Sequence, residues 1–342
     1  MARIWINIGR GSRPRKSCSV SSDSDLIISS VYIGSMYTTL ITSSFRKAHP
    51  STKIIETTLK SLRIVMPDVF DNPIVIAQDQ HDDKKYEEYL NNLKELVRSE
   101  PLYRNVKIVY NDSPVNRSLV SNLEHALQFV PTKYVWVLQD DLLFFKAISL
   151  PAIMADMESN GAIKYVRTTI GAPPMRSIAE PISFVSSHSD YTFEEDRVYD
   201  HESGIIHMGR LRSGTDSVML QTFTGVGLDE LTSWDYGPPF PDVAPFDTRH
   251  VGGLKKGKEY NYIEATLYSD LVFFTTKEYL TSKVLGSPIR AHVDVDGMSY
   301  PEGFMARITG SDPEGFGIHV LAETTHPFTT CLHLDGRNST LS

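Results

Sequence analysis

Between residues 35 and 145, short apolar runs alternate with longer segments in which apolar residues recur at helical spacing. The apolar runs are YTTLITSSF (37–45), NPIVIAQD (72–79), VKIVYND (106–112) and YVWVL (134–138). They predict buried strands, because they are apolar almost throughout and polar residues bound them. The segments that predict amphipathic helices lie between them, at 49–66, 82–100 and 118–130. Strands that alternate with helices indicate an α/β fold, with a parallel sheet covered by helices on both faces.

The second half of the chain is less regular. Residues 172–262 are rich in Pro, Gly, Ser and Asp. A long stretch without periodicity predicts functional loops rather than a second compact domain. Further strands are expected at 217–223, 262–268 and 271–274, and short helices at 275–285 and 301–308.

The first 30 residues differ from the rest. They carry five basic residues, followed by a serine-rich patch, and lack the periodicity of a core element. We expect residues 1–30 to form a loose N-terminal arm, and residues 31–342 to form a single domain.

Composition narrows the function classes. The chain has 342 residues and a net charge of −8, which argues against general nucleic-acid binding. Its two cysteines, Cys18 and Cys331, form neither a disulfide framework nor a CxxC metal pair, so a reducing compartment is expected. No apolar run has the length of a transmembrane helix, and the start lacks the apolar core of a signal peptide. These features predict a soluble, cytoplasmic protein.

Polar residues follow each of the four predicted strands. They are Ser43-Ser44, Asp79, Asn111-Asp112 and Gln139-Asp140-Asp141. The carboxyl ends of parallel strands share one edge of the sheet, where ligands bind in such folds. Two adjacent carboxylates there can hold a divalent cation, whose charge offsets their repulsion. The alternative interpretation is a solvated strand end or a helix cap, where Asp is also common.

The spacing of other motifs disfavours or excludes the chemistry that each would carry. In HESGIIH (201–207) the two histidines are six residues apart and do not share a helix face, so we interpret both as loop residues rather than zinc ligands. In HVDVDGMSYPEG (292–303) the register does not fit a calcium-binding EF-hand. The sequence has no nucleophile elbow, Walker loop or dinucleotide fingerprint. GRGSRPRK (9–16) is similar to the glycine-rich loop of sugar nucleotidylyltransferases, although no helix pattern follows it.

The order of several motifs carries a resemblance to a known family. TTLITSSF and STKIIETTLKSL give a strand, a turn and a long helix; Asp79 ends the second strand; NRSLVSNLEHAL (116–127) and LQDD follow. From Thr38 to Phe145 the chain thus resembles the nucleotide-sugar-binding half of a GT-A glycosyltransferase of the family 2 type. Gln139 departs from the acidic residue that often opens the last motif. In the second half, YSDLVFFTTKEYL (268–280), PEGFM (301–305) and HLDGRN (333–338) resemble glycosyltransferases encoded by large DNA viruses of algae.

The resemblance implies a metal-dependent glycosyltransferase with a GT-A fold. Residues 35–146 would bind a nucleotide-sugar donor, UDP- or GDP-linked, and residues 147–342 a glycan, glycoprotein or other hydroxyl acceptor. Mn²⁺ or Mg²⁺ would meet the leaving diphosphate, held by Asp141 and His333. The implied donor contacts are Thr42, Ser43, Ser44, Asp79, Arg117, Asn122 and Asp140. Aromatic residues that could stack on acceptor sugars are Tyr191, Trp234, Tyr236 and Phe240.

An inverting enzyme also needs a general base. The resemblance assigns this role to Glu302, the second residue of PEGFMARI, with Glu264, Asp270 and Asp296 as rivals. A retaining enzyme would need no such base. For Glu302 the alternative is an ordinary acidic residue in a first helical turn. Arg117 has the alternative of a solvated loop residue, and His333 that of a core or surface histidine.

Two other functions stay open. One is a sugar nucleotidylyltransferase that uses residues 9–16 to bind a triphosphate. The other is a non-enzymatic carbohydrate-binding protein, which would bind glycans without donor or metal.

Overall fold

The structure, a computed structural model, describes most of the first half of the chain and parts of the second. The described residues are 35–45, 51–81, 83–111, 119–144, 146–170, 192–200, 205–213, 216–223, 254–265, 272–286, 305, 309, 312–323, 326–327 and 329–335. All belong to one unit, Gly34–Ser342. The arm predicted at 1–30 and most of the helix predicted at 301–308 lie outside the described residues.

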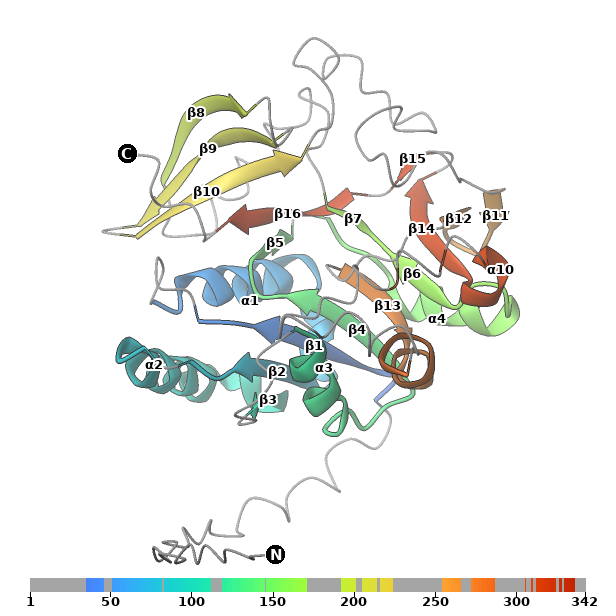
Figure 1. Cartoon of the computed structure of the whole chain (residues 1–342), viewed down its shortest axis with the longest axis horizontal. Helices are drawn as coiled ribbons and strands as arrows, with labels where there is room; N and C mark the ends of the chain where they lie inside the picture. Colours follow the sequence, from blue (N-terminus) through green and yellow to red (C-terminus); the bar gives the residue numbers. More distant parts are fainter. Residues whose placement is uncertain are drawn as a thin grey trace, which may run out of the picture. The chain divides into compact units, whose positions relative to one another are not determined.

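The first half forms the predicted parallel sheet. Its strands lie side by side in the order β3-β2-β1-β4, and every neighbouring pair is parallel (Figure 1). The strands are β1 (Tyr37–Ser43), β2 (Ile74–Asp79), β3 (Val106–Asn111) and β4 (Tyr134–Gln139). The helices between them are α1 (Lys53–Val65), η2 (Pro67–Asp71), α2 (Lys85–Ser99), η3 (Pro101–Asn105) and α3 (Leu119–Leu127). The α/β class predicted from the sequence is confirmed, with helices a few residues shorter than expected.

Helices cover both faces of this sheet. In β4, the fully buried Trp136 belongs to one apolar cluster, which also contains Leu59 of α1 and Leu93 of α2. Its neighbour Val137 belongs to a second cluster, which contains Leu123 of α3. Successive side chains of a strand point to opposite faces, so the two clusters are the cores on the two sides of the sheet.

The second half extends the same sheet beyond β4. Antiparallel β13 lies next to β4, and β6, β14, β12 and β11 follow in that order, with β15 paired to β14. These strands are β6 (Tyr165–Arg167), β11 (Leu254–Lys256), β12 (Asn261–Glu264), β13 (Val272–Thr276), β14 (Ile318–Glu323) and β15 (His326–Pro327). Among the described residues of this half, the helices are α4 (Leu150–Ser159), α7 (Lys277–Tyr279), the π-helix η5 (Leu280–Leu285) and α10 (Pro313–Phe316).

A second sheet corrects part of the sequence interpretation. Its order is β5-β16-β10-β9-β8, with β7 paired to β16. The strands are β5 (Leu142–Phe144), β7 (Thr169–Ile170), β8 (Thr192–Asp200), β9 (Ile205–Ser213), β10 (Asp216–Phe223) and β16 (Thr329–Asp335). The expectation that 172–262 are loops is therefore wrong for β8 and β9, and also for β11 of the first sheet. His207 lies in a strand rather than a loop. Backbone pairing between neighbouring strands forms these elements, and such pairing needs no apolar periodicity. His201 lies outside the described residues.

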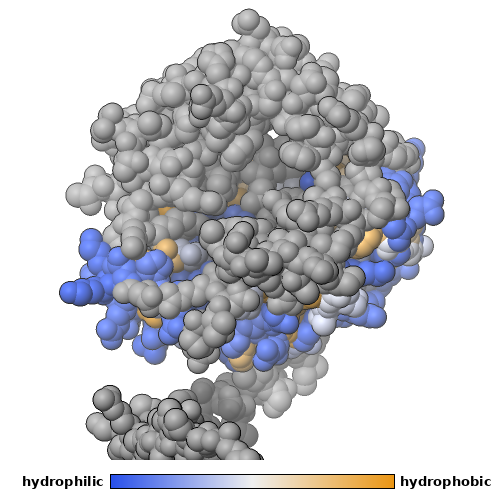
Figure 2. Space-filling view, viewed as in Figure 1, coloured by the Kyte–Doolittle hydropathy of each residue, from blue (hydrophilic) through white to orange (hydrophobic). Residues whose placement is uncertain are grey.

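The described surface is mostly hydrophilic on the face shown in Figure 2. Among the residues that the structure describes, the large apolar side chains that are exposed are Met36, Ile64 and Leu102. No described helix combines the length and the hydrophobicity that a membrane crossing requires.

Asp156 of α4 provides the first testable prediction, which concerns stability. It is 1% exposed, and its carboxylate accepts hydrogen bonds from the Lys258 amide (2.7 Å) and the Tyr262 hydroxyl (2.8 Å), linking α4 to the β11–β12 hairpin. Burial, and then the Asp156 carboxylate, raises the pKa of Tyr262, so its hydroxyl stays a donor. A Cβ at Gly257 would collide with the same carboxylate, so the hairpin approaches closely. Asp156→Ala should lower the free energy of unfolding by about 3 kcal/mol, because the buried Tyr262 hydroxyl and the partly buried Lys258 amide both lose their acceptor.

Urea denaturation followed by circular dichroism measures this loss. Asp156→Asn is the matched control, since its amide oxygen can still accept a hydrogen bond and it should lose less. An Asp156→Ala protein as stable as the wild type would show that Asp156 does not hold the hairpin.

Candidate functional site

The strand order reverses between β1 and β4. The chain runs from β1 outward to β2 and β3, then returns to place β4 on the other side of β1. In open α/β sheets, the carboxyl ends of the strands at such a reversal form the crevice in which ligands bind. Thr42 near the end of β1 pairs with Gln139 at the end of β4. The crevice position is therefore occupied by Ser43 and Ser44 on one side and Asp140 and Asp141 on the other.

The polar ends of the parallel strands gather as the sequence predicted. Ser43 pairs with Gln78, and Asp79 pairs with Asn111. The strands therefore end at one level, and their terminal polar residues lie along one edge of the sheet. This part of the prediction is confirmed.

Asp140 ties the ends of β1 and β4 together. Its side chain is 2% exposed, and its carboxylate accepts a 2.6 Å hydrogen bond from the Ser43 hydroxyl. Its amide donates to the carbonyl of Thr42 at 3.0 Å. The hydroxyl of Thr42 donates to the Leu138 carbonyl at 3.2 Å. In this structure Thr42 and Ser43 thus support the acidic pair from within the protein, and their contact with a donor stays a prediction.

Asp141 is 1% exposed and lies between two peptide groups that α1 holds. The Thr58 hydroxyl donates to the carbonyl of Asp140 at 2.6 Å and accepts from the Leu142 amide at 3.1 Å. One turn later, the Ser61 hydroxyl accepts from the Phe144 amide at 3.0 Å. The segment that carries the two carboxylates is therefore fixed to the helix at several points.

The second sheet brings β16 next to Asp141. His333 in β16 pairs with Leu142, the residue after Asp141, so the strand pairing places its backbone beside the acidic pair. Cys331, two residues earlier, is fully buried as a free thiol. Burial raises the pKa of this thiol to about 12, and the negative charge of Asp141 adds to the rise. The side chain of His333 lies outside the described residues, so its metal role stays a prediction.

The residues present fit a hard divalent cation. Asp140 and Asp141 are buried, adjacent and supply oxygen donors, the ligands that Mg²⁺ and Mn²⁺ take. Within the described parts of the chain, no group of three His, Cys, Asp or Glu side chains is arranged to hold a metal. Mg²⁺ is commonly held by one or two carboxylates together with substrate phosphates and water. A site built on the Asp141 carboxylate, with Asp140 beside it and a diphosphate to complete it, matches that pattern.

The other predicted donor contacts lie along the same edge or near it. Ser44 is exposed, directly after β1. Asp79 is half-buried at the end of β2, where its carbonyl accepts from the Tyr86 hydroxyl at 2.6 Å. Asn122 of α3 is 1% exposed and donates its amide to the Ala77 carbonyl at 2.9 Å. Its buried side-chain oxygen has no hydrogen-bond partner among the described residues.

Several predicted site residues cannot be placed. Arg117, Glu302 and the rivals Asp270 and Asp296 lie outside the described residues, as do the aromatic residues Tyr191, Trp234, Tyr236 and Phe240. The remaining rival, Glu264, is the last residue of β12 and is separated from β4 by β14, β6 and β13. At the usual strand spacing it is roughly 19 Å away across the sheet.

Sequence reasoning missed Thr58 and Ser61. Both lie on the buried face of α1, next to Leu59 and Leu62, which are fully buried. Hydroxyl groups on the apolar face of a helix need partners, because an unpaired buried hydroxyl is costly. The place of these two hydroxyl residues on the apolar face of a predicted helix is the feature of the sequence that could have identified them.

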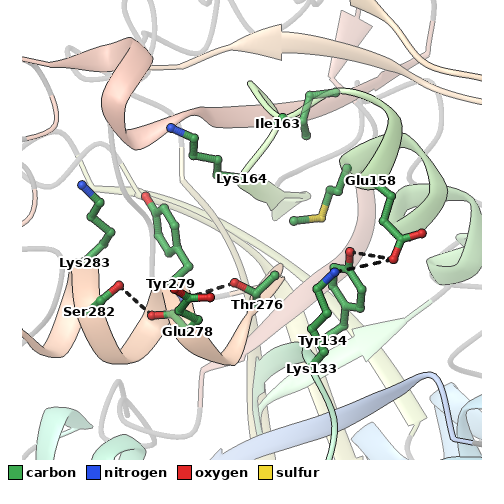
Figure 3. A pocket seen from close by; sticks show the side chains of 12 residues that line it. Lys133, Tyr134, Glu158, Ile163, Lys164, Thr276, Glu278, Tyr279, Ser282 and Lys283 are labelled. Carbon is green, nitrogen blue, oxygen red and sulfur yellow. Dashed lines mark hydrogen bonds and ion pairs between the residues drawn. The ribbon is translucent and has the colours of Figure 1, made fainter.

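A cavity of about 530 Å³ lies at the other end of β4 (Figure 3). Its lining includes Lys133 and Tyr134 at the amino end of this strand, roughly 20 Å from Asp140 at the usual rise per residue. The Lys133 amine lies 3.6 Å from a carboxylate oxygen of Glu158, and the Tyr134 hydroxyl donates to the same oxygen at 3.2 Å. Lys164 donates to the Gly315 carbonyl at 3.0 Å. These lining charges are engaged within the protein, so the acidic pair at the carboxyl edge is the stronger candidate site.

Comparison with known proteins gives a partial structural likeness. No protein-family model matches the sequence, and no curated protein does. Among solved structures, the chain is similar to glucosyl-3-phosphoglycerate synthase from Mycobacterium tuberculosis in complex with Mn²⁺, UDP-glucose and phosphoglyceric acid. That match has 12% identity and a TM-score of 0.29, and covers 45% of this chain and 50% of that one. The complex of the same enzyme with Mn²⁺, UDP and glucosyl-3-phosphoglycerate matches at 13% identity, a TM-score of 0.29 and the same coverage. The chain thus spans about half the length of this enzyme.

Proposed function

We propose that this chain is a metal-dependent glycosyltransferase that moves a sugar from a UDP- or GDP-linked donor to a hydroxyl group of a glycan or glycoprotein. The observation that carries the proposal is the buried pair Asp140–Asp141 at the point where the strand order reverses. Buried adjacent carboxylates repel each other, so this pair is best explained by a cation that offsets its charge. The order of motifs in residues 38–145 supplies the reaction class.

Asp141 and His333 would hold Mn²⁺ or Mg²⁺. The ion would offset the charge that the diphosphate leaving group gains as the sugar is transferred. One carboxylate oxygen of Asp140 accepts a hydrogen bond from the Ser43 hydroxyl, and this bond orients the carboxylate. We assign its other oxygen to the donor ribose.

The remaining donor contacts follow from position. Asp79 at the end of β2 would meet the base. Ser44 lies directly after β1 and is exposed, so it would reach the donor. Arg117, next to the start of α3, would contact phosphate or sugar. Asn122 would use the side-chain oxygen that is buried beside β2. Thr42 and Ser43 would act on the donor indirectly, because their hydrogen bonds hold the end of β4 and the Asp140 carboxylate in place.

Acceptor chemistry falls to the second half of the chain. Glu302 would remove the proton of the acceptor hydroxyl during an inverting transfer. Aromatic residues between 191 and 240 would stack on the acceptor sugar. The cytoplasmic location and the resemblance to enzymes of algal viruses stay predictions from the sequence.

A thermal-shift screen tests the proposal. UDP-, GDP-, CMP- and dTDP-sugars are each added with and without Mn²⁺. We expect one nucleotide class to stabilise the protein only when Mn²⁺ is present, because a ligand that binds the native state raises its stability. Stabilisation by glycans alone, without donor or metal, would favour a carbohydrate-binding protein. Release of pyrophosphate from a nucleoside triphosphate and a sugar 1-phosphate would favour a nucleotidylyltransferase.

Deleting residues 1–30 should leave donor binding intact. All residues of the proposed site have numbers of 42 or higher. The sequence of the arm lacks the apolar periodicity of a core helix or strand, so the fold should not depend on it. The measurement is the donor-dependent thermal shift of the truncated protein beside that of the full chain. A folded truncation that has lost its donor shift would revive the nucleotidylyltransferase role of GRGSRPRK.

A further inference from the structure

One hydroxyl group of α1 contacts the backbone on both sides of Asp141. Thr58 is fully buried, and its Oγ1 donates to the Asp140 carbonyl at 2.6 Å while it accepts from the Leu142 amide at 3.1 Å. The same oxygen lies 3.4 Å from the Ile54 carbonyl of its own helix. The hydroxyl has one proton, and the shorter contact, to Asp140, is the stronger hydrogen bond.

This arrangement differs from the usual behaviour of a threonine inside a helix. Such a hydroxyl commonly bonds the carbonyl four residues earlier, as Thr57 does with Lys53 at 2.8 Å. Ser61 repeats the arrangement one turn later, where it accepts from the Phe144 amide and donates to the Thr58 carbonyl at 2.8 Å. Two successive turns of α1 therefore hold the segment from Asp140 to Phe144.

We infer that Thr58 is a positioning residue for the Asp141 carboxylate. With the peptide groups before and after Asp141 both bonded to one buried hydroxyl, the backbone of Asp141 cannot rotate without breaking a bond. The backbone of Asp141 is therefore already ordered before a cation binds. This inference rests on the proposed function, because it takes Asp141 to be a metal ligand.

The consequence is a measurable effect on metal affinity. Groups that orient a metal ligand without touching the metal typically contribute about 10- to 100-fold to its affinity. Thr58→Val removes the hydroxyl and keeps the branched shape, so it should weaken Mn²⁺ binding within that range. Thr58→Ser keeps the hydroxyl and should retain most of the affinity. Thr57→Val is the matched control, because it removes a buried hydroxyl of the same helix that bonds only its own helix in the structure.

Two readouts separate positioning from a general loss of stability. Calorimetry with Mn²⁺ and the full chain gives the Kd of each variant. Hydrogen exchange of the peptide that covers residues 140–144, measured without metal, reports on the Leu142 amide. We expect slow exchange in the wild type and in Thr57→Val, and faster exchange with a weaker Kd in Thr58→Val. Thr58→Ala gives the same comparison if the valine variant does not fold.

The outcomes distinguish the inference from the proposed function. A folded Thr58→Val protein with the wild-type Kd for Mn²⁺, or with unchanged exchange at Leu142, would overturn the inference. Binding lost equally in Thr57→Val would also overturn it, because the effect would then belong to helix stability. A wild-type protein that binds no Mn²⁺ would overturn the metal site of the proposed function, and the exchange of Leu142 would still decide whether Thr58 holds this segment.

Discussion

Asp141→Asn is expected to abolish the Mn²⁺-dependent stabilisation of the protein by its nucleotide-sugar donor. The substitution preserves the size of a residue that is 1% exposed, and it removes the charge by replacing one carboxylate oxygen with an amide nitrogen. An amide oxygen is a much poorer ligand for a hard divalent cation than a carboxylate. Residues that merely orient a ligand contribute 10- to 100-fold, so losing the ligand itself should weaken Mn²⁺ binding by at least about a hundredfold. Donor hydrolysis at saturating Mn²⁺ should fall with it.

The metal-free protein should respond in the opposite direction. Without a cation, two adjacent buried carboxylates repel each other, and each is penalised by the loss of solvent. Asp141→Asn removes one of these charges, so its thermal midpoint without metal should equal or exceed that of the wild type. Thermal unfolding with and without Mn²⁺ measures both effects in one experiment.

Asp140→Asn is the matched control, because it removes the other charge of the same acidic pair. The asparagine oxygen can still accept the hydrogen bond from Ser43, and Asp140 is assigned to the ribose rather than to the metal. Its Mn²⁺ affinity should therefore fall less than that of Asp141→Asn. Donor hydrolysis by Asp141→Asn at the wild-type rate in saturating Mn²⁺ would remove this residue from the site.

The parallel half of the fold was predictable because local and global signals agree there. β1, β2 and β4 are buried along almost their whole length, and β3 at the edge is partly buried. The strands therefore read as apolar runs, and polar residues mark their ends. The paired residues Thr42 and Gln139 show that the ends of β1 and β4 meet at one level. The sequence order of strands and helices was sufficient to bring Asp140 and Asp141 to the edge where ligands bind.

The second sheet was not predictable in the same way. β8 and β9 mix charged, apolar and glycine residues. β8 pairs with β9 and β9 with β10, and only β10 joins this group to β16, which lies far from it in the sequence. The role of Thr58 was equally hidden. Its contact with the Asp140 carbonyl joins residues 82 positions apart, and in the sequence it is one hydroxyl residue within an ordinary amphipathic helix. Tertiary contacts of this kind leave no periodic signal.

Glu302→Gln is expected to lower turnover by roughly a hundredfold or more, the range typical of losing a general base. Glutamine keeps the size and hydrogen bonding of the side chain and cannot accept a proton. Glu302 lies outside the described residues, so this expectation rests on the sequence, which predicts a helix that begins at Pro301 and has Glu302 as its second residue. The positive end of a helix dipole keeps such a carboxylate ionised, which a base requires before attack. Donor affinity should barely change, because this side chain would face the acceptor hydroxyl rather than the diphosphate.

Glu264→Gln is the matched control for this experiment. Glu264 is the last residue of β12, and three strands lie between β12 and β4. Replacing its carboxylate should therefore leave turnover close to that of the wild type. Steady-state rates with saturating donor, together with donor affinity from the thermal shift, give the two quantities to compare. If Glu302→Gln turns over within a few fold of the wild type, Glu302 is an ordinary residue of a first helical turn. Substitution of Asp270 and Asp296 would then identify the base, and full activity in both would indicate a retaining enzyme, which needs no such base.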